Sequence, residues 1–211
     1  MYQPEPFREQ RLSVQHDLIQ RHPLGLLVTH GASGLCANLL PFHLALAPST
    51  NGRLEAHLAR ANPQVEDLKS GAEVLVIFQG PEAYVTPSWY PSKQPSGRAV
   101  PTWNYVTVQV RGRPQLVESD AWLRQHLHRL TQQQEQGRAE PWEVGDAPEA
   151  YIAGQLKGIV GLEVEIDQLE GKWKISQNRS RPDQHGVIAG LQEEGADAMA
   201  TLMTQWATDK D

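Results

Sequence analysis

The dipeptide Asn51-Gly52 stands between two short segments that alternate apolar and polar residues, at 43–47 and 53–58. Asn-Gly is the strongest short signal for a β-hairpin, because both residues accept the positive φ angles that a tight turn needs. A hairpin at this point makes the two flanking segments antiparallel neighbours. The sequence therefore predicts an antiparallel β-meander around this turn.

The same pattern of short apolar runs and turn residues continues along the chain. We expect a long loop at 81–103, rich in Pro and aromatic residues, and breaks at Gly112, Pro114 and Gly171. Further strands are expected at 24–29, 35–40, 73–79, 106–110, 113–117, 159–169 and 173–177. The pattern indicates a mainly β protein.

Helical patterns are fewer and lie between or after these strands. Asn62 is placed to cap a short helix that has Pro63 at its first position, and Ser119 is placed to cap a longer one. One apolar face of the longer helix is expected to carry Trp122, Leu123, His126, Leu127 and Leu130. Residues 146–149 resemble a capping box that opens another helix, and 196–206 indicates a C-terminal helix. We expect a single domain of residues 1–211, with a helical insertion at about 119–157 and a C-terminal helix at about 195–208.

Composition narrows the class of protein. The longest apolar run, residues 74–78, is far below the roughly 20 residues that span a bilayer. A lone Cys36 and an N-terminus without a signal-like apolar run favour a cytoplasmic location. The net charge of −6 disfavours non-specific attraction to a polyanion such as DNA.

Common catalytic and nucleotide-binding motifs are missing from the sequence. It contains no Gly-x-Gly-x-x-Gly, no P-loop, no Gly-x-Ser-x-Gly and no paired Cys motif. His126 and His128 are two positions apart on a predicted helix, so they point in different directions and make poor joint metal ligands. We assign no catalytic residue and no metal site.

Three segments carry residues suited to binding. Residues 84–93 and 100–105 concentrate aromatic side chains, hydroxyls and a cation, which suits a flat ligand but also the sealing of a barrel mouth or a subunit interface. Residues 57–62 pass from a strand into a helix and could hold a phosphate, although Asn62 could be only a cap and Arg60 only a solvated charge. Residues 172–179 place Lys172, Lys174 and Ser176 on one face, which is also how an edge strand is protected by Lys.

Several blocks, in order, resemble the PaiB-type family of FMN-binding negative transcriptional regulators. They are residues 1–4 with Phe7, 57–63 (HLARANP), 83–93 (AYVTPSWYPSK), 100–105 (VPTWNY), 141–142 with 146–148, and 176–179 (SQNR). The resemblance extends from residue 1 to about 191 and is more specific than any one block. It implies the split β-barrel shared with pyridoxamine-phosphate oxidases, in which two subunits hold FMN along their interface. It thus implies a homodimer.

The resemblance also implies which residues contact FMN. In such folds a strand and the following turn hold the phosphate, which points to His57, Leu58, Arg60 and Asn62, with Leu40, Pro41 and Phe42 on the preceding hairpin strand. The isoalloxazine ring needs an apolar wall and a few donors, which Trp103, Asn104, Lys174, Ser176 and Gln177 offer.

Three functions remain open from the sequence. The first is an FMN-binding negative regulator of transcription, with DNA as a partner by resemblance only. The second is a small FMN-dependent reductase or oxidase. The third is haem binding, with His43 or His57 as axial ligand, because some split barrels hold haem.

Overall fold

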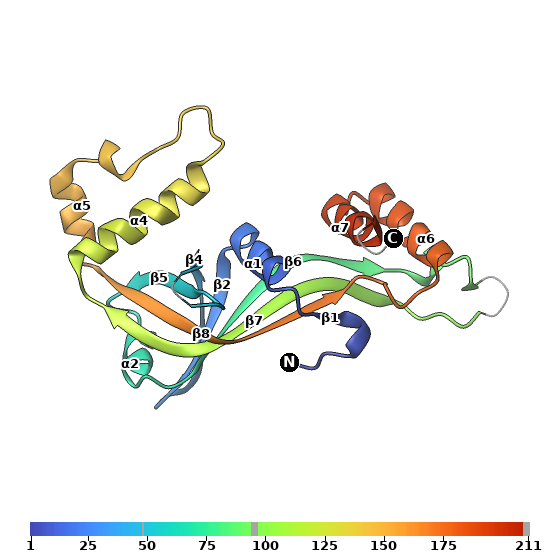
Figure 1. Cartoon of the computed structure of the whole chain (residues 1–211), viewed down its shortest axis with the longest axis horizontal. Helices are drawn as coiled ribbons and strands as arrows, with labels where there is room; N and C mark the ends of the chain where they lie inside the picture. The colour runs from blue at the N-terminus through green and yellow to red at the C-terminus, as the bar shows by residue number, and fades with distance from the viewer. Residues whose placement is uncertain (48, 94–96, 209–211) are drawn as a thin grey trace. The chain divides into compact units, whose positions relative to one another are not determined.

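The computed structural model describes residues 1–47, 49–93 and 97–208 of the chain (Figure 1). The strands are β1 (Arg8–Glu9), β2 (Leu24–Gly31), β3 (Gly34–Pro41), β4 (His43–Ala45), β5 (Arg53–Ala59), β6 (Val74–Val85), β7 (Thr102–Val117) and β8 (Ile159–Lys174). The α-helices are α1 (Leu12–Arg21), α2 (Gln64–Lys69), α4 (Asp120–Glu135), α5 (Glu149–Leu156), α6 (Arg181–Glu193) and α7 (Asp197–Thr208). Short 3-10 helices are η1 (Glu5–Phe7), η2 (Pro87–Trp89) and η3 (Val144–Asp146).

Within the described residues the strands form one sheet, in the order β3-β2-β6-β7-β8-β5-β4, with β1 added to β8. The pairings of β2 with β3 and β6, of β4 with β5, and of β8 with β5 and β1 are antiparallel. The predicted antiparallel, mainly β architecture is therefore confirmed.

The chain divides into two compact units, each of which is described by itself. The central unit comprises His16–Phe78 and Gln109–Leu169, and the terminal unit comprises Met1–Gln15, Gln79–Val108 and Glu170–Asp211. Strands β6, β7 and β8 have residues in both units. The prediction of a single domain over residues 1–211 stays a prediction.

The core of the central unit is built from alternate residues of its strands. Phe42 and Phe78 are fully buried and meet edge to face, with ring centroids 5.6 Å apart. The registers His57↔Gly161 and Glu55↔Glu163 align β5 with β8. Burying each large apolar side chain in this way contributes about 1.5–3 kcal/mol.

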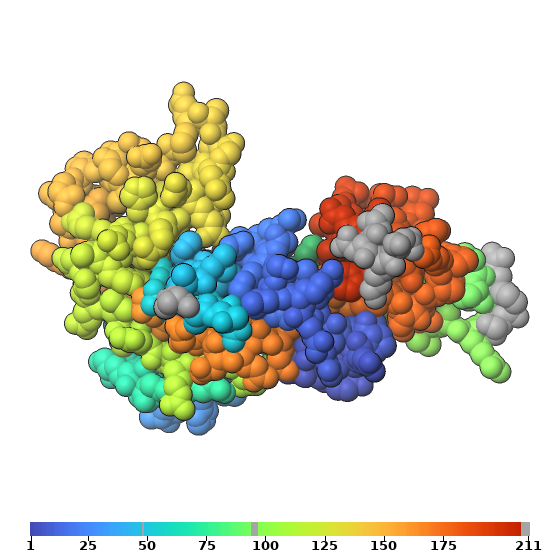
Figure 2. Space-filling view, viewed as in Figure 1, coloured from blue at the N-terminus to red at the C-terminus, as the bar shows by residue number. Residues whose placement is uncertain are grey.

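The two helices α4 and α5 of the central unit form a small apolar cluster around Leu123, Ile152 and Leu156. Figure 2 shows the segment that connects them, drawn in yellow, projecting away from the pair. Ser119 caps α4 as predicted, because its hydroxyl accepts the Trp122 backbone N–H at 3.3 Å. The predicted capping box at 146–149 is wrong: the reciprocal bonds join Glu143 and Asp146 at η3, and Pro148 precedes α5 without a side-chain cap.

The terminal unit buries Trp173, Val187, Leu191, Met199 and other apolar residues. Its helices α6 and α7 pack side by side (Figure 1). Neither α1 nor α6 is among the helices expected from the sequence, although Ser180 caps α6 by accepting the Asp183 N–H at 3.4 Å. Among the described residues, no helix is both long enough and apolar enough to cross a bilayer.

Three predicted strand breaks are wrong. The chain continues through Gly112 and Pro114 in β7 and through Gly171 in β8. These two glycines permit close approach instead of turning the chain: a Cβ would lie 2.0 Å from the Glu165 carbonyl oxygen at Gly112 and 2.9 Å from that of Glu9 at Gly171. A glycine in a strand pattern can mean either situation, and the neighbouring strand decides which.

Two predicted loops also change length. Strand β6 runs on to Val85, so the connection to β7 covers residues 86–101 instead of 81–103, and its residues 94–96 lie outside the described part. The hairpin of β4 and β5 is confirmed, but β4 ends at Ala45 and residues 46–52 form the connection, of which residue 48 lies outside the described part. Gly52 takes the positive φ, 84°.

Candidate functional site

In the terminal unit the side chain of Lys174 lies against the start of β7. Its ammonium group donates to the Thr102 hydroxyl and to the Trp103 carbonyl oxygen. The sequence-predicted pair Lys174 and Trp103 is therefore brought together, 71 positions apart in the chain. The contact forms because β8 ends, at Lys174, beside the residues that begin β7.

The positive charge at this place is shared by two lysines on the same face of β8. The ammonium groups of Lys172 and Lys174 lie 5.3 and 5.9 Å from the ring centroid of Tyr105, and Lys172 lies 5.5 Å from that of Tyr2. No ion pair joins either lysine to a carboxylate of the described residues. Burial, helped by the charges of Lys172 and Arg179, lowers the pKa of Lys174. Such a cluster favours a ligand with negative charge or carbonyl oxygens.

Trp103 offers an apolar wall beside these cations. Its side chain is 52% exposed, which is unusual for so large a ring, and it meets Tyr84 edge to face at 5.9 Å. An exposed indole next to a cation suits a flat aromatic ligand.

The other predicted ring contacts are used inside the protein. Ser176 and Asn104 are buried, and the Ser176 hydroxyl donates to the Asn104 side-chain carboxamide oxygen at 3.1 Å. Gln177 accepts the Ile175 backbone N–H at 2.8 Å and donates to the Trp173 carbonyl. Ser176 has a φ of 64°, which is rare for a residue with a side chain and marks a constrained turn. These three residues shape the turn after β8, while Trp103 and Lys174 present groups at its surface.

In the central unit the predicted phosphate residues end β5 and lead into α2. The Asn62 carboxamide oxygen accepts the Gln64 backbone N–H at 3.0 Å, so Asn62 acts as a cap, although α2 begins one residue later than predicted. Arg60 is 41% exposed and pairs with the exposed Glu118 at 3.3 Å. Leu58 is buried in the core.

The predicted contacts on the preceding hairpin strand lie mostly in the interior. Leu40 and Phe42 are buried, and Pro41 is half-buried. Phe42 also donates its backbone N–H to the Pro23 carbonyl at 2.8 Å. If these residues meet a ligand, their side chains shape the wall behind it.

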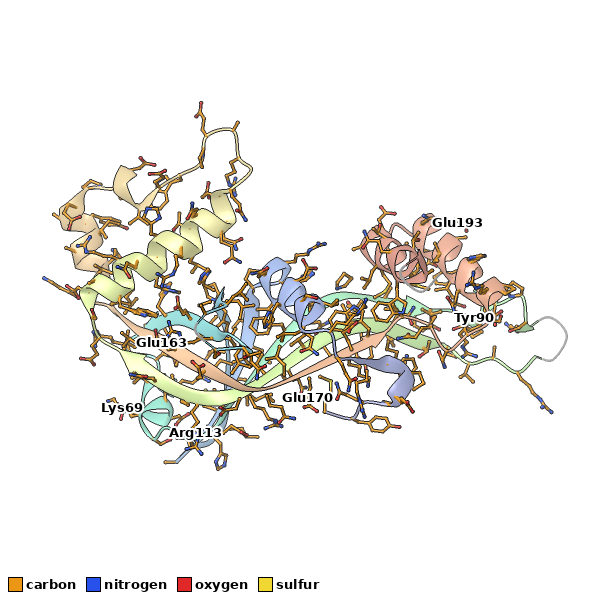
Figure 3. All side chains as sticks on the ribbon, in the orientation of Figure 1. Lys69, Tyr90, Arg113, Glu163, Glu170 and Glu193 are labelled. Carbon is orange, nitrogen blue, oxygen red and sulfur yellow. The ribbon has the colours of Figure 1, made fainter. Side chains whose placement is uncertain are left out.

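His57 belongs to a row of polar contacts between α4 and the sheet, which lie close together in Figure 1. Residues four, three and four positions apart on a helix share one face. On this face Trp122 donates to Glu163 at 2.7 Å, His126 contacts His57 at 3.1 Å, Arg129 donates to Glu55 at 2.6 Å and Gln133 contacts His43 at 3.1 Å. Figure 3 labels Glu163, the residue of β8 that accepts from Trp122. We call these four contacts the α4 seam.

The expected face of α4 carries polar contacts as well as apolar ones. Trp122 and His126 make polar bonds to the sheet, and Trp122 also packs, with Leu127, against the apolar cluster that contains Leu123. Sequence reasoning also missed Glu55, whose buried carboxylate accepts from Arg53 at 2.9 Å and from Arg129. The available signal is a charged residue at a buried position of an otherwise apolar strand, because such charges are paired in folded proteins.

Burial disfavours the charged form of His57 and His126. Burial, helped by the charges of His57, Arg129 and His43, lowers the pKa of His126 to about 3. Burial also lowers the pKa of His57. Neither ring is part of a metal-ligating group of three within the described residues.

Comparison with known proteins gives one family and several relatives. Residues 1–168 match the model of a family described as "Putative FMN-binding domain". The chain is 34% identical over 233 residues to an uncharacterized protein of Emericella nidulans, an alignment that covers 94% of this chain and 93% of the relative. It is 32% identical over 206 residues to the Bacillus subtilis Protease synthase and sporulation protein PAI 2, and 96% of each chain is covered. Among solved structures, the FAD and heme binding protein from Mycobacterium smegmatis is similar in fold, with a TM-score of 0.56, 18% identity and coverage of 78% of this chain and 71% of that one.

Proposed function

This chain belongs to the PaiB-type family of FMN-binding split-barrel proteins, and on this premise we propose that it is a homodimeric, flavin-dependent negative regulator of transcription. The predictions of a split β-barrel and of FMN, or a related flavin, as cofactor are confirmed. The regulatory role, the homodimer, the DNA partner and the individual contact residues are the content of the proposal.

The arrangement of Trp103 and Lys174 carries the proposal that a flavin ring binds in the terminal unit. An exposed indole and an ammonium group without a carboxylate partner among the described residues fit a flat ring that carries carbonyl oxygens. Two of the three ammonium hydrogens of Lys174 are used by Thr102 and Trp103, so one is free for a ligand oxygen.

For the phosphate, the proposal relies on Arg60 and the ring of His57. Arg60 and Glu118 are both exposed, so their ion pair contributes at most about 1 kcal/mol. A phosphate dianion can therefore replace Glu118 as the partner of Arg60. His57 lies on the strand that leads to Arg60, and its ring is only half-buried.

The regulatory part is supported by the family resemblance and by the Bacillus subtilis relative, which is named a protease synthase and sporulation protein. Homodimerisation is supported by apolar side chains on the β2–β3 hairpin: Leu35, Leu39 and Leu24 are 77%, 59% and 57% exposed. A strand edge with such residues is open to pairing with a second chain.

Titration of ligand-stripped protein with FMN and with riboflavin, followed by flavin fluorescence, tests the ring site. We expect saturation near one flavin per chain. Lys174→Met should lower the affinities for FMN and riboflavin about equally, because it removes a contact to the ring that both ligands share. Lys157→Met, an exposed lysine after α5, is the matched control and should bind as the wild type does. Absence of binding by the wild type, or unchanged binding by Lys174→Met, would contradict the proposed site.

A gel shift on promoter DNA with and without FMN tests the regulator, with light scattering for the mass. We expect a salt-sensitive shift that depends on flavin, and a dimer that Leu39→Lys converts to monomer. A wild-type monomer would refute the dimer, and no shift on any candidate promoter would refute direct DNA binding.

A flavin-dependent reductase or oxidase is the second candidate, and the positive charge of Lys174 favours it. Bound FMN would supply hydride or electron transfer, and the ammonium group of Lys174, which lies beside Trp103, would favour the reduced ring. Bleaching of bound flavin by NADH or NADPH under anaerobic conditions would support this function over a purely regulatory one.

A further inference from the structure

His57 and His126 share one hydrogen bond between strand β5 and helix α4. The Nδ1 atom of His57 lies 3.1 Å from the Nε2 atom of His126, and the rings meet edge to face with centroids 5.3 Å apart. Burial lowers the pKa of each histidine below the ordinary value of about 6.5, so at pH 7 and above both nitrogens belong to neutral rings. Each ring therefore carries a single N–H, and one of these two hydrogens lies between the rings.

His126 has no freedom to satisfy its second nitrogen. The ring is fully buried and stacks on Trp122 with an interplanar angle of 12°. Its Nδ1 atom is buried and has no hydrogen-bond partner in the described part of the chain. In folded proteins a buried backbone N–H without a partner is rarer than a buried carbonyl oxygen without one, and we extend this preference to the ring nitrogen.

This difference selects the tautomers of both rings. If His57 donated from Nδ1, His126 would carry its hydrogen on the unpartnered Nδ1. If His126 donates from Nε2, its Nδ1 is bare, and His57 carries its own hydrogen on Nε2. The second arrangement avoids a buried N–H without an acceptor, so it is the favoured one.

The Nε2 atom of His57, on a half-buried ring, is not fully buried. It makes no hydrogen bond within the described residues, and it is not among their buried unpartnered polar atoms, so it reaches the surface. In the favoured arrangement this surface nitrogen is an N–H donor. A donor suits an oxygen of a phosphate and does not suit a metal ion or an ammonium group.

We infer that His126 is a positioning residue, which fixes His57 as the Nε2–H tautomer and so presents a hydrogen-bond donor to the phosphate of FMN. The inference rests on the proposed function for its ligand, but the tautomer itself is a property of the protein alone. It gives the helical insertion a role at the flavin site through one residue of α4.

Nitrogen-15 NMR of the ligand-free protein, labelled at histidine, tests the tautomer, because protonated and bare ring nitrogens have widely separated shifts. We expect His57 to show a protonated Nε2 and a bare Nδ1. His126→Phe keeps a flat ring against Trp122 but removes the donor, so His57 should become a mixture of tautomers. His126→Gln supplies an amide donor and should restore the wild-type pattern. A wild-type His57 protonated at Nδ1 would overturn the inference.

Titrations with FMN and riboflavin test the consequence for the ligand. His126→Phe should lower the affinity for FMN by about tenfold, which is the scale of one hydrogen bond to a charged group. The affinity for riboflavin should be unchanged, since riboflavin has no phosphate. The exposed His128→Phe is the control on the same helix. In a His57→Ala background, His126→Phe should add nothing.

The outcomes separate the inference from the function on which it rests. If the wild type binds no FMN, the proposed function fails, while the NMR pattern still decides the tautomer. If the wild type binds FMN and His126→Phe lowers the affinity for riboflavin as much as the affinity for FMN, the positioning role is wrong. It is also wrong if His126→Phe lowers the FMN affinity by the same factor in the His57→Ala background.

Discussion

The indole nitrogen of Trp122 donates to the carboxylate of Glu163 at 2.7 Å, and the same indole stacks on His126. One side chain of α4 thus contacts strand β8 and supports the histidine that contacts β5. Since Glu163 also pairs with Arg53 at 3.3 Å, the carboxylate links a helix and two neighbouring strands. Because Arg53 also pairs with Glu55, the Trp122–Glu163 and Arg129–Glu55 contacts of the α4 seam belong to one polar network, and loss of one member is expected to affect the other.

Trp122→Phe should destabilise the fold without preventing it. The variant keeps an aromatic ring against His126 but leaves Glu163, whose side chain is 14% exposed, with Arg53 alone. A hydrogen bond to a charged group contributes about 1.5–3 kcal/mol, so the free energy of unfolding should fall by that order. Urea denaturation measures it. Trp142→Phe, at a 45% exposed position, should change it by less than about 0.5 kcal/mol, and equal losses in both variants would contradict this role of Glu163.

His126 should make stability depend on pH. Its pKa is about 3 in the folded protein and about 6.5 in the unfolded chain, so between these values only the unfolded chain takes up the proton. The free energy of unfolding is then highest above pH 6.5 and falls as the pH is lowered toward 3, by at most about 1.4 kcal/mol per pH unit from this group. His57, whose pKa is also lowered, acts in the same direction.

Denaturation of the wild type and of His126→Phe at successive pH values from 7 downward checks this prediction. The variant should be less stable at pH 7 but lose stability more slowly on acidification. His128→Phe should keep the wild-type slope. Parallel curves for the wild type and His126→Phe would show that His126 does not titrate as its burial requires.

Gly190 of α6 should not tolerate a side chain. A Cβ there would lie 2.2 Å from the Cε2 atom of Trp89, so Gly190→Ala must displace the indole and should cost about 1–3 kcal/mol. Gly154 of α5 is the control: no described atom lies within 4 Å of its Cβ position, and Gly154→Ala should stabilise by about 0.5–1 kcal/mol through helix propensity. Thermal or urea unfolding gives both values, and a neutral Gly190→Ala would mean that Trp89 moves freely.

Much of the strand arrangement follows from local pattern, because alternation and hairpin turns are properties of neighbouring residues. The breaks at Gly112 and Gly171 could not be judged this way, since what a glycine does in a strand depends on the backbone opposite it. Helix α6 could have been predicted: Ser180 followed by Pro182 and Asp183 is a helix-start pattern.

In the candidate site, too, some features follow from local sequence pattern and others depend on tertiary packing. That Lys172 and Lys174 share a face follows from the two-residue period of a strand, and both lie near Tyr105. The contact between His57 and His126 joins residues 69 positions apart in the chain, and no local sequence pattern predicts it. Which polar residues are used internally, as Asn104 and Ser176 are, likewise depends on tertiary packing.

Arg60 and Asn62 give the sharpest test of the phosphate prediction, because each can be changed while the fold is kept. Arg60→Gln removes only an exposed ion pair. Asn62→Asp keeps an oxygen to accept the Gln64 N–H but adds a negative charge that repels phosphate. Both variants should lower the affinity for FMN by roughly tenfold or more, because each affects an ion pair or charge-assisted bond to the phosphate. The affinity for riboflavin should be unchanged.

Arg111→Gln is the matched control for these two variants, since Arg111 also makes an exposed ion pair, with Glu73 at 3.2 Å, but lies outside the predicted site. Its FMN affinity should equal that of the wild type. Unchanged FMN affinity in Arg60→Gln and Asn62→Asp would show that the phosphate does not bind at the turn between β5 and α2. The ring site at Lys174 and Trp103 would then stand alone, because riboflavin, which lacks the phosphate, reports on it independently.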